Sequence, residues 1–235
     1  MRAAYKELVG IRAESAQIEG MLELPPDAAG VVLFAHGSGS SRLSPRNNQV
    51  AEMLREEQFG TLLVDLLTPA EDRDYETRFD ISLLTARLDA ALGWLLQQNA
   101  ARDLPIGLFG ASTGAAAALQ LAALRADAVA AVVSRGGRPD LAGLRALEKV
   151  EAPTLLIVGE LDHVVVDLNR SSYMALHCEK RLDIVPGATH LFQEPGALDA
   201  VALSAAEWFH RYLSYPAQGM QPPSVGGGAA ERRPL

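Results

Sequence analysis

Cysteine and aromatic residues are scarce in this sequence of 235 residues. The single cysteine, Cys178, excludes a disulfide within the chain, which is typical of proteins from reducing compartments. Phe, Trp and Tyr together make up 6% of the residues. The hydrophobic core should therefore be built mainly from aliphatic side chains.

Long apolar runs and blocks of like charge are also missing. No stretch approaches the ~18 consecutive apolar residues of a membrane-spanning helix, and charges interrupt the N-terminal residues where a signal peptide would be apolar. The net charge is −8, without a cluster of Lys and Arg, so the surface should repel the phosphates of nucleic acids. We expect a soluble, cytoplasmic protein that binds neither membranes nor nucleic acids. The sequence leaves open whether it forms homo-oligomers.

Eight short apolar segments predict a mostly parallel β-sheet. Runs such as VVLFA and TLLIV are continuously apolar, as strands covered on both faces are. The first two segments alternate instead, and they predict an antiparallel hairpin at the sheet edge. The expected strands cover residues 6–11, 17–23, 30–35, 61–64, 106–109, 129–133, 154–158 and 181–185.

Helical patterns alternate with the later strands, and Ile81, Leu84 and Leu88 share one face of the clearest of them. This alternation predicts a three-layer α/β domain over residues 1–215, with helices on both faces of the sheet. We interpret the Pro- and Gly-rich residues 216–235 as a disordered tail. The expected helices cover residues 45–58, 81–99, 113–125, 167–178 and 197–213.

The motif G-A-S-T-G at residues 110–114 follows an expected strand and begins an expected helix. A serine at such a turn projects above the sheet edge on a strained backbone, and the flanking glycines leave room for the turn. The N-terminus of the next helix directs N–H groups and partial positive charge at the reacting oxygen. This context indicates that Ser112 is a nucleophile.

An aspartate and a histidine follow two later strands, in the order that a Ser–Asp–His triad has on such a sheet. Asp162 stands in G-E-L-D and His190 in P-G-A-T-H. Because functional residues gather at the carboxyl ends of the strands, both should lie near Ser112. We expect His190 to act as the base and Asp162 to orient it. Glu160 and Asp140 are alternative acids, less favoured than Asp162.

A second loop, with the sequence H-G-S-G-S, follows the expected strand at 30–35. An oxyanion hole takes one N–H from the residue after the nucleophile, here Thr113, and another from this loop. Ser38 is the expected second donor, and Gly37 beside it lets a substrate approach the backbone closely. We interpret His36 as a structural residue that orients the loop.

These motifs together resemble the α/β-hydrolase superfamily, and within it the dienelactone hydrolase-like group. The resemblance covers about residues 15–214 and implies an eight-stranded, mostly parallel sheet, no cofactor or metal, and acyl transfer from esters or lactones to water. Dienelactone hydrolases proper use a cysteine nucleophile, whereas Ser112 stands at that place here, which favours a serine esterase. The stretch between Ser134 and Pro153 is too short for a cap domain.

Other residues are candidates for contacts with the substrate. The segment at 65–80 lacks periodicity, and we interpret it as a loop that shapes an open pocket. In this loop, Tyr75 and Phe79 are candidates for lining the acyl site. Basic side chains near the strand ends could hold a substrate carboxylate or, alternatively, pin the loops by salt bridges: Arg42, Arg46 and Arg135.

The sequence therefore predicts a serine hydrolase that cleaves esters or lactones of small to medium size through an acyl-enzyme on Ser112. The expected partner is this small-molecule substrate. Two alternatives stay open. One is an acyltransferase or perhydrolase that uses the same acyl-enzyme, and the other is a ligand-binding homologue without catalysis.

Overall fold

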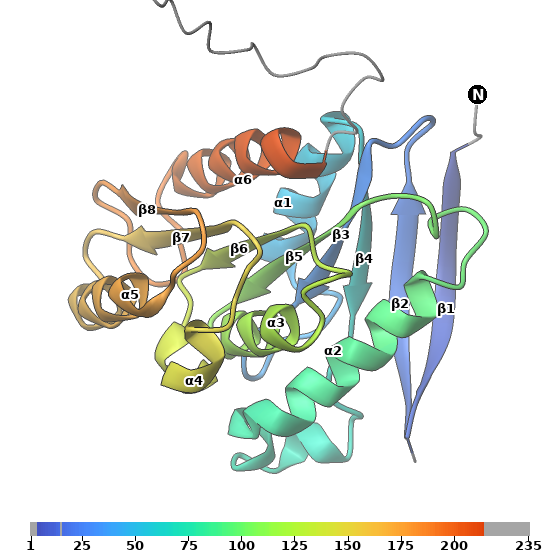
Figure 1. Cartoon of the computed structure of the whole chain (residues 1–235), viewed down its shortest axis with the longest axis horizontal. Helices are drawn as coiled ribbons and strands as arrows, with labels where there is room; N and C mark the ends of the chain where they lie inside the picture. The colour runs from blue at the N-terminus through green and yellow to red at the C-terminus, as the bar shows by residue number, and fades with distance from the viewer. Residues whose placement is uncertain (1–3, 15, 214–235) are drawn as a thin grey trace, which may run out of the picture.

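Eight strands form one continuous sheet between two layers of helices (Figure 1). The computed structural model describes residues 4–14 and 16–213. The strand order is β1-β2-β4-β3-β5-β6-β7-β8, in which β2 is antiparallel to both of its neighbours and the other pairs are parallel. The strands are β1 Tyr5–Ala13, β2 Ala16–Leu24, β3 Gly30–Ala35, β4 Phe59–Val64, β5 Ile106–Ala111, β6 Ala131–Arg135, β7 Thr154–Gly159 and β8 Lys180–Val185.

The burial of each strand follows its place in the sheet. β1 and β2 form the predicted antiparallel hairpin, in which Ile11 lies opposite Ile18. Every second residue in the C-terminal half of β1 is buried, because α2 covers one face of this edge. Every residue of β3, β4, β5, β6 and β7 is buried. These strands are covered on both faces, as their continuous apolar runs predict.

Helices α1 and α6 cover one face of the sheet, and α2, α3, α4 and α5 cover the other (Figure 1). Local signals set two of the helix starts. The Ser44 side chain accepts a hydrogen bond from the N–H of Asn47 at the start of α1, and Asp80 does the same for Leu83 in α2. The helices are α1 Pro45–Glu56, α2 Ile81–Leu95, α3 Thr113–Leu124, α4 Leu144–Leu147, α5 His163–Ala175 and α6 Ala197–Leu213.

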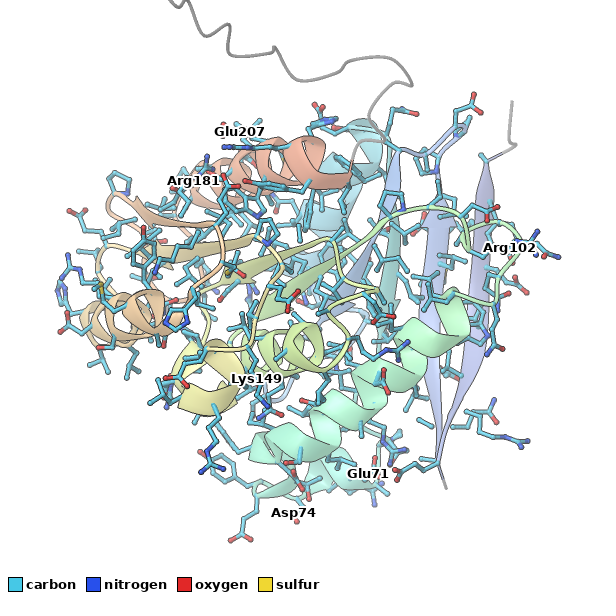
Figure 2. All side chains as sticks on the ribbon, viewed as in Figure 1. Glu71, Asp74, Arg102, Lys149, Arg181 and Glu207 are labelled. Carbon is cyan, nitrogen blue, oxygen red and sulfur yellow. The ribbon has the colours of Figure 1, made fainter. Side chains whose placement is uncertain are left out.

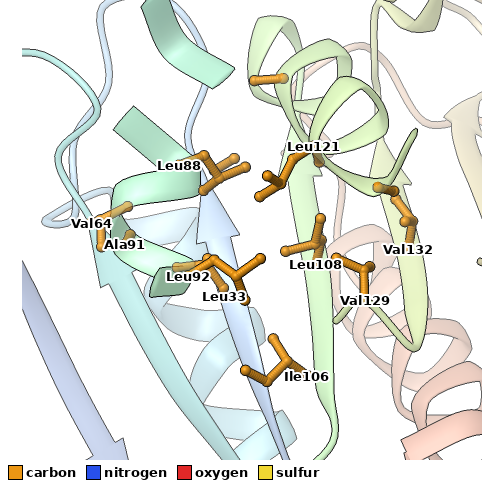
Figure 3. Packing of buried hydrophobic residues seen from close by; sticks show 14 of the residues in the cluster. Leu33, Val64, Leu88, Ala91, Leu92, Ile106, Leu108, Leu121, Val129 and Val132 are labelled. Atoms are coloured by element: carbon orange, nitrogen blue, oxygen red, sulfur yellow. The ribbon is translucent and has the colours of Figure 1, made fainter. Parts of the chain in front are cut away.

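The core is aliphatic, as the composition predicts. Between α2, α3 and the sheet, Leu88 and Leu92 face Leu33 and Leu108 (Figure 3). The alanines at 115–118 are fully buried. Their small side chains let α3 lie close to the strand that precedes it, and this holds the start of α3 at the sheet edge.

The expected helix at 167–178 is wrong at both ends. α5 begins at His163, because Val165 and Val166 pack against β7. It ends at Ala175, where the chain turns to bury Leu176 completely. Cys178 consequently lies in the connection to β8 and not in a helix.

Two connections contain short elements that have no clear sequence pattern. The segment at 65–80 includes two 3-10 turns, Glu71–Arg73 and Thr77–Phe79. The connection from β6 to β7 holds the 3-10 turn Pro139–Ala142 and α4, so no cap domain is inserted there. The predicted tail at 216–235 lies outside the described residues.

Charged side chains lie around the outside of the molecule (Figure 2). Arg181 of β8 and Glu207 of α6, for example, form an exposed ion pair at 3.2 Å. Among the residues that the structure describes, no helix is both long enough and apolar enough to cross a membrane.

Candidate active site

The order of the strands reverses direction at β3, and such a reversal leaves a crevice at the edge of the sheet. From β3 the chain moves to β4 on one side, whereas β5 adds to the other side of β3. Ligands of such sheets bind at this reversal, outside the carboxyl ends of the strands. A cavity of about 230 Å³ lies there, and its lining includes Ser38, Ser112, Arg135 and His190. With Gly37 and Arg46, which also line it, the structure brings six of the predicted site residues to one cavity.

Ser112 has a strained backbone at the turn from β5 into α3. Its φ is 51° and its ψ is −121°, which is a costly conformation for a residue with a side chain. The turn is held from both sides. The N–H of Ser112 donates to the carbonyl oxygen of Arg135 at 3.3 Å, and its carbonyl oxygen accepts from the N–H of Arg138 at 3.1 Å.

The two glycines of the motif give clearance to α3. A Cβ on Gly110 would overlap the backbone of Ala115 in the first turn of the helix. A Cβ on Gly114 would overlap the carbonyl oxygens of Ala35 and His36 at the end of β3. The glycines therefore let the helix begin directly against the sheet, which is what places Ser112 at the crevice.

Asp162 and His190 are joined by a hydrogen bond. The Nδ1 atom of His190 lies 2.6 Å from Oδ2 of Asp162. Asp162 immediately precedes α5, and the N–H of Leu161 beside it donates to Ala188 O at 2.9 Å, which ties the two loops together. Nδ1 is engaged by the carboxylate, and His190 lines the same cavity as Ser112.

The alternative acids have other partners. Asp140 accepts two hydrogen bonds from the guanidinium of Arg138, at 2.8 and 2.7 Å. Glu160 accepts from the N–H of Gly187 at 2.8 Å. Asp162 is therefore the carboxylate that the structure pairs with His190.

His36 fixes the loop that follows β3. Its Nε2 accepts a hydrogen bond from the N–H of Leu66 at 2.9 Å, and its Nδ1 lies 2.9 Å from the carbonyl oxygen of Gly37. Burial lowers the pKa of His36, which keeps the ring neutral and Nε2 available as an acceptor. The loop then closes in a tight turn, with Gly39 at a φ of +66° and the N–H of Ser40 donating to Gly37 O.

One of the predicted oxyanion donors, Ser38, lies in this loop, and the other, Thr113, lies close to it. Thr113 is the first residue of α3, and the first N–H groups of a helix have no partner within it. Ser38 lines the cavity together with Ser112, and it shares a small adjoining hollow with Thr113. Ser38 and Thr113 therefore lie close together, and their role as oxyanion donors stays a prediction.

Three of the predicted substrate contacts lie away from the cavity lining. Arg42 pairs with Asp65 and with Glu19, the latter at 2.6 Å, so it pins loops together. Tyr75 and Phe79 pack on each other, with ring centroids 5.0 Å apart, and Tyr75 is 70% exposed. Their part in substrate binding stays a prediction.

The segment at 65–80 is anchored to the rest of the fold. Glu71 accepts a hydrogen bond from the buried Arg87 of α2 at 2.8 Å. Arg87 also donates to the carbonyl oxygen of Ala13 in β1. Within the segment, Arg78 pairs with Asp72 at 3.0 Å. These bonds connect the segment to α2, and through Arg87 to β1.

Two residues at the site have no signal in the sequence. Asn47 of α1 accepts a hydrogen bond from Nη2 of Arg135 at 3.2 Å. Phe192 places its ring centroid 5.9 Å from Cζ of the same guanidinium. Both contacts depend on packing between distant segments, and no spacing of residue types announces them. Within residues 4–14 and 16–213, no three His, Cys, Asp or Glu side chains gather as metal ligands would.

The architecture and the position of this cavity define an α/β-hydrolase fold. The chain belongs to the dienelactone hydrolase family, whose sequence model matches residues 18–218. It is 52% identical to a dienelactone hydrolase of known structure from Anabaena variabilis, covering 89% of this chain and 99% of that one, with a TM-score of 0.86. Est1E from Butyrivibrio proteoclasticus shares the fold at 15% identity, with a TM-score of 0.75 over 87% of this chain and 98% of its own.

Two curated relatives from strains of Mycobacterium tuberculosis carry a different name, "Putative phosphoribosyl transferase". Each is 52% identical to this chain over 210 residues, which are 89% of this chain and 47% of the relative. The chain therefore spans about half the length of the curated relatives that it matches. The family and the fold are those of hydrolases.

Proposed function

We propose that this chain is a serine hydrolase of the carboxylesterase type, which cleaves esters or lactones of small to medium size. The observation that supports this most strongly is the meeting of a strained Ser112 and the hydrogen-bonded pair of His190 and Asp162 at one cavity. A serine on a strained turn beside such a pair is the arrangement that nucleophilic acyl transfer requires.

In the proposed mechanism, Ser112 Oγ attacks the ester carbonyl while Nε2 of His190 takes its proton. Asp162 holds the imidazole in the required tautomer and stabilises the imidazolium. The N–H groups of Thr113 and Ser38 hold the oxyanion, and each such donor is typically worth ~3 kcal/mol to the transition state. His190 then protonates the leaving alcohol, and water that His190 activates releases the acid from the enzyme.

A panel of p-nitrophenyl esters from acetate to laurate, with simple lactones beside it, tests this proposal. The wild type should hydrolyse part of the panel, and Ser112→Ala should lose that activity. Ser171→Ala serves as the matched control, because Ser171 is an exposed serine on α5. Wild-type rates in Ser112→Ala would contradict the assignment of Ser112 as the nucleophile. If the wild type hydrolysed no ester or lactone of the panel, the proposed esterase function would be contradicted.

Two other functions are separated by further arms of the same assay. An acyltransferase or perhydrolase would pass the acyl group to added alcohol or peroxide in preference to water. His190 has 40% of its side chain exposed, which leaves it open to water and favours hydrolysis. The name of the mycobacterial relatives applies to proteins about twice as long, so we expect no turnover of phosphoribosyl pyrophosphate with nucleobases.

A further inference from the structure

The loop at 136–138, which follows β6, is held against the turn of Ser112. The N–H of Arg138 donates to the carbonyl oxygen of Ser112 at 3.1 Å. The last residue of β6 holds the other side of the turn, since the carbonyl oxygen of Arg135 accepts from the N–H of Ser112 at 3.3 Å. One short stretch of chain therefore fixes both polar groups of the strained serine backbone, and a shift of this stretch would move the serine.

The same loop lies against the turn that carries His190. Gly136 has a φ of +50°, and a Cβ on it would stand 3.1 Å from the carbonyl oxygen of His190 and 3.7 Å from its Cε1 atom. The N–H of Gly136 donates to the carbonyl oxygen of Ile157 in β7 at 2.7 Å. The loop thus contacts the segments that carry the proposed nucleophile and the proposed base.

Asn169 ties this loop to α5, the helix that begins directly after Asp162. Its side chain is fully buried, about two helical turns beyond Asp162. The Nδ2 atom of Asn169 donates to the carbonyl oxygen of Gly137 at 3.0 Å and to that of Val165 at 2.8 Å. Because carbonyl oxygens only accept, the NH2 group of the amide is what holds the loop.

Asparagine is an unfavourable choice for this position if it only fills the core. Val165 and Val166 are buried on the same helix, and apolar side chains such as theirs need no hydrogen bonds. The Oδ1 atom of Asn169 is buried without a hydrogen-bond partner in the described part of the chain, which destabilises the fold further. The bond to the buried Gly137 is the contribution that an apolar side chain could not make.

We propose that Asn169 is a positioning residue for the reaction at Ser112. Its bond to Gly137 fixes the loop at 136–138 relative to α5, and the loop sets the separation of Ser112 from His190. The effect on catalysis rests on the proposed function, whereas the link between α5 and the loop does not. Reacting atoms must approach to about 3–3.5 Å, and a misplacement of about 1 Å can lower the rate roughly 10²-fold.

The first test separates kcat from KM in two variants of Asn169. Asn169→Leu replaces the amide by an apolar group of the same branched shape. Asn169→Ser keeps a hydroxyl that can bond to the carbonyl oxygen of Val165 within the helix, but its side chain is too short to reach Gly137. Both variants should lower kcat for the best ester roughly ten- to a hundredfold, with KM within about twofold of the wild type.

Ser172→Ala is the matched control, because Ser172 is buried on the same helix about one turn beyond Asn169. It should keep the kcat of the wild type. The Tm of each variant is measured beside the kinetics, and rates are compared at a temperature where every variant is folded. A lower kcat in a folded variant of Asn169 then reports misplaced groups and not unfolding.

The second test does not depend on catalysis. Hydrogen exchange of the full chain measures the protection of the N–H groups of Gly136 and Arg138, which are bonded to Ile157 and Ser112. In both Asn169 variants these two groups should exchange roughly three- to tenfold faster than in the wild type, as the loss of one hydrogen bond predicts. Protection in the centre of β5 should stay as in the wild type.

The outcomes separate this proposal from the proposed function. Lower kcat and faster exchange of the loop in the Asn169 variants support it. Wild-type kcat in a folded Asn169 variant, unchanged exchange of the loop, or an equal loss of kcat in Ser172→Ala overturns it. A wild type that hydrolyses no ester or lactone overturns the proposed function instead, and hydrogen exchange alone then decides on the link. If Asn169→Leu does not fold, Asn169→Ser gives the same comparison.

Discussion

Gly37 lies against Ser112 so closely that a Cβ atom on Gly37 would stand 2.9 Å from the Cβ of Ser112. The same atom would be 3.2 Å from the carbonyl oxygen of Ala111. The loop after β3 therefore passes directly over the turn that carries the serine. Two segments far apart in the sequence form one surface here, and the absence of a side chain at Gly37 is what allows it.

The first prediction concerns this contact. Gly37→Ala should push the loop away from Ser112 and displace the N–H of Ser38, which lowers kcat for the best ester by roughly 10²- to 10³-fold, the cost of losing one oxyanion donor. Gly93→Ala is the matched control, because a Cβ on Gly93 meets nothing within 4 Å. Steady-state kinetics would contradict the loop's role if both variants kept wild-type kcat.

The second prediction concerns the start of α3. Gly114→Ala should lower the free energy of unfolding by about 1–3 kcal/mol, because the added methyl group overlaps backbone oxygens that have little freedom to move. Gly93→Ala, inside α2, should raise it by up to about 1 kcal/mol through helix propensity. Urea unfolding of both variants measures the difference. An unfolding midpoint of Gly114→Ala at or above that of the wild type would show that the helix start tolerates a side chain.

The third prediction concerns the acid. Asp162→Asn should preserve the fold and lower kcat by up to roughly 10⁴-fold, the loss known for this change in another serine hydrolase triad. Asp140→Asn should leave kcat near the wild-type value, because Asp140 is bound to Arg138. Kinetics at saturating ester compare the two. A larger loss of kcat in Asp140→Asn than in Asp162→Asn would show that Asp140, and not Asp162, is the acid of the triad.

The fourth prediction concerns His36 and pH. Because burial lowers the pKa of His36 below its ordinary 6.5 in the folded protein, the unfolded chain binds a proton at a pH where the folded chain does not. The stability contributed by His36 is therefore complete above about pH 6.5 and declines below it, by up to about 1.4 kcal/mol per pH unit.

The test of this pH effect compares the wild type with His36→Gln. Glutamine keeps an acceptor for the N–H of Leu66 but does not titrate. Unfolding free energies measured from about pH 8 to about pH 5 should fall more steeply for the wild type, by the linkage slope. If the unfolding free energies of the two proteins changed in parallel with pH, His36 would not be the cause of the loss of stability in acid.

Much of the fold follows from the sequence, because burial on two faces leaves a plain signature. The strand expected at 30–35 matches β3 in full, and the helix expected at 197–213 matches α6. The helix expected at 167–178 is present as α5, but its limits are wrong, because they depend on the burial of Val165 and Leu176. Tertiary packing of this kind has no local pattern.

The candidate site also has a part that the sequence predicts and a part that it does not. The placement of Ser112 and His190 at one cavity, and the contact of His190 with Asp162, could be expected from the sequence, since each residue follows a strand. Their catalytic roles stay a prediction. The contact between Asn47 and Arg135 is not predictable. It joins the start of α1 to the end of β6, and only the assembled sheet brings these two residues together.

The most direct test of the account is covalent labelling of the nucleophile. A fluorophosphonate should add one adduct to the wild-type chain, and peptide mass spectrometry should place it on Ser112. Ser112→Ala should take up no label and hydrolyse no ester, while Ser171→Ala should behave as the wild type. An adduct on another residue, or ester hydrolysis that persists in Ser112→Ala, would contradict the central claim that Ser112 forms the acyl-enzyme.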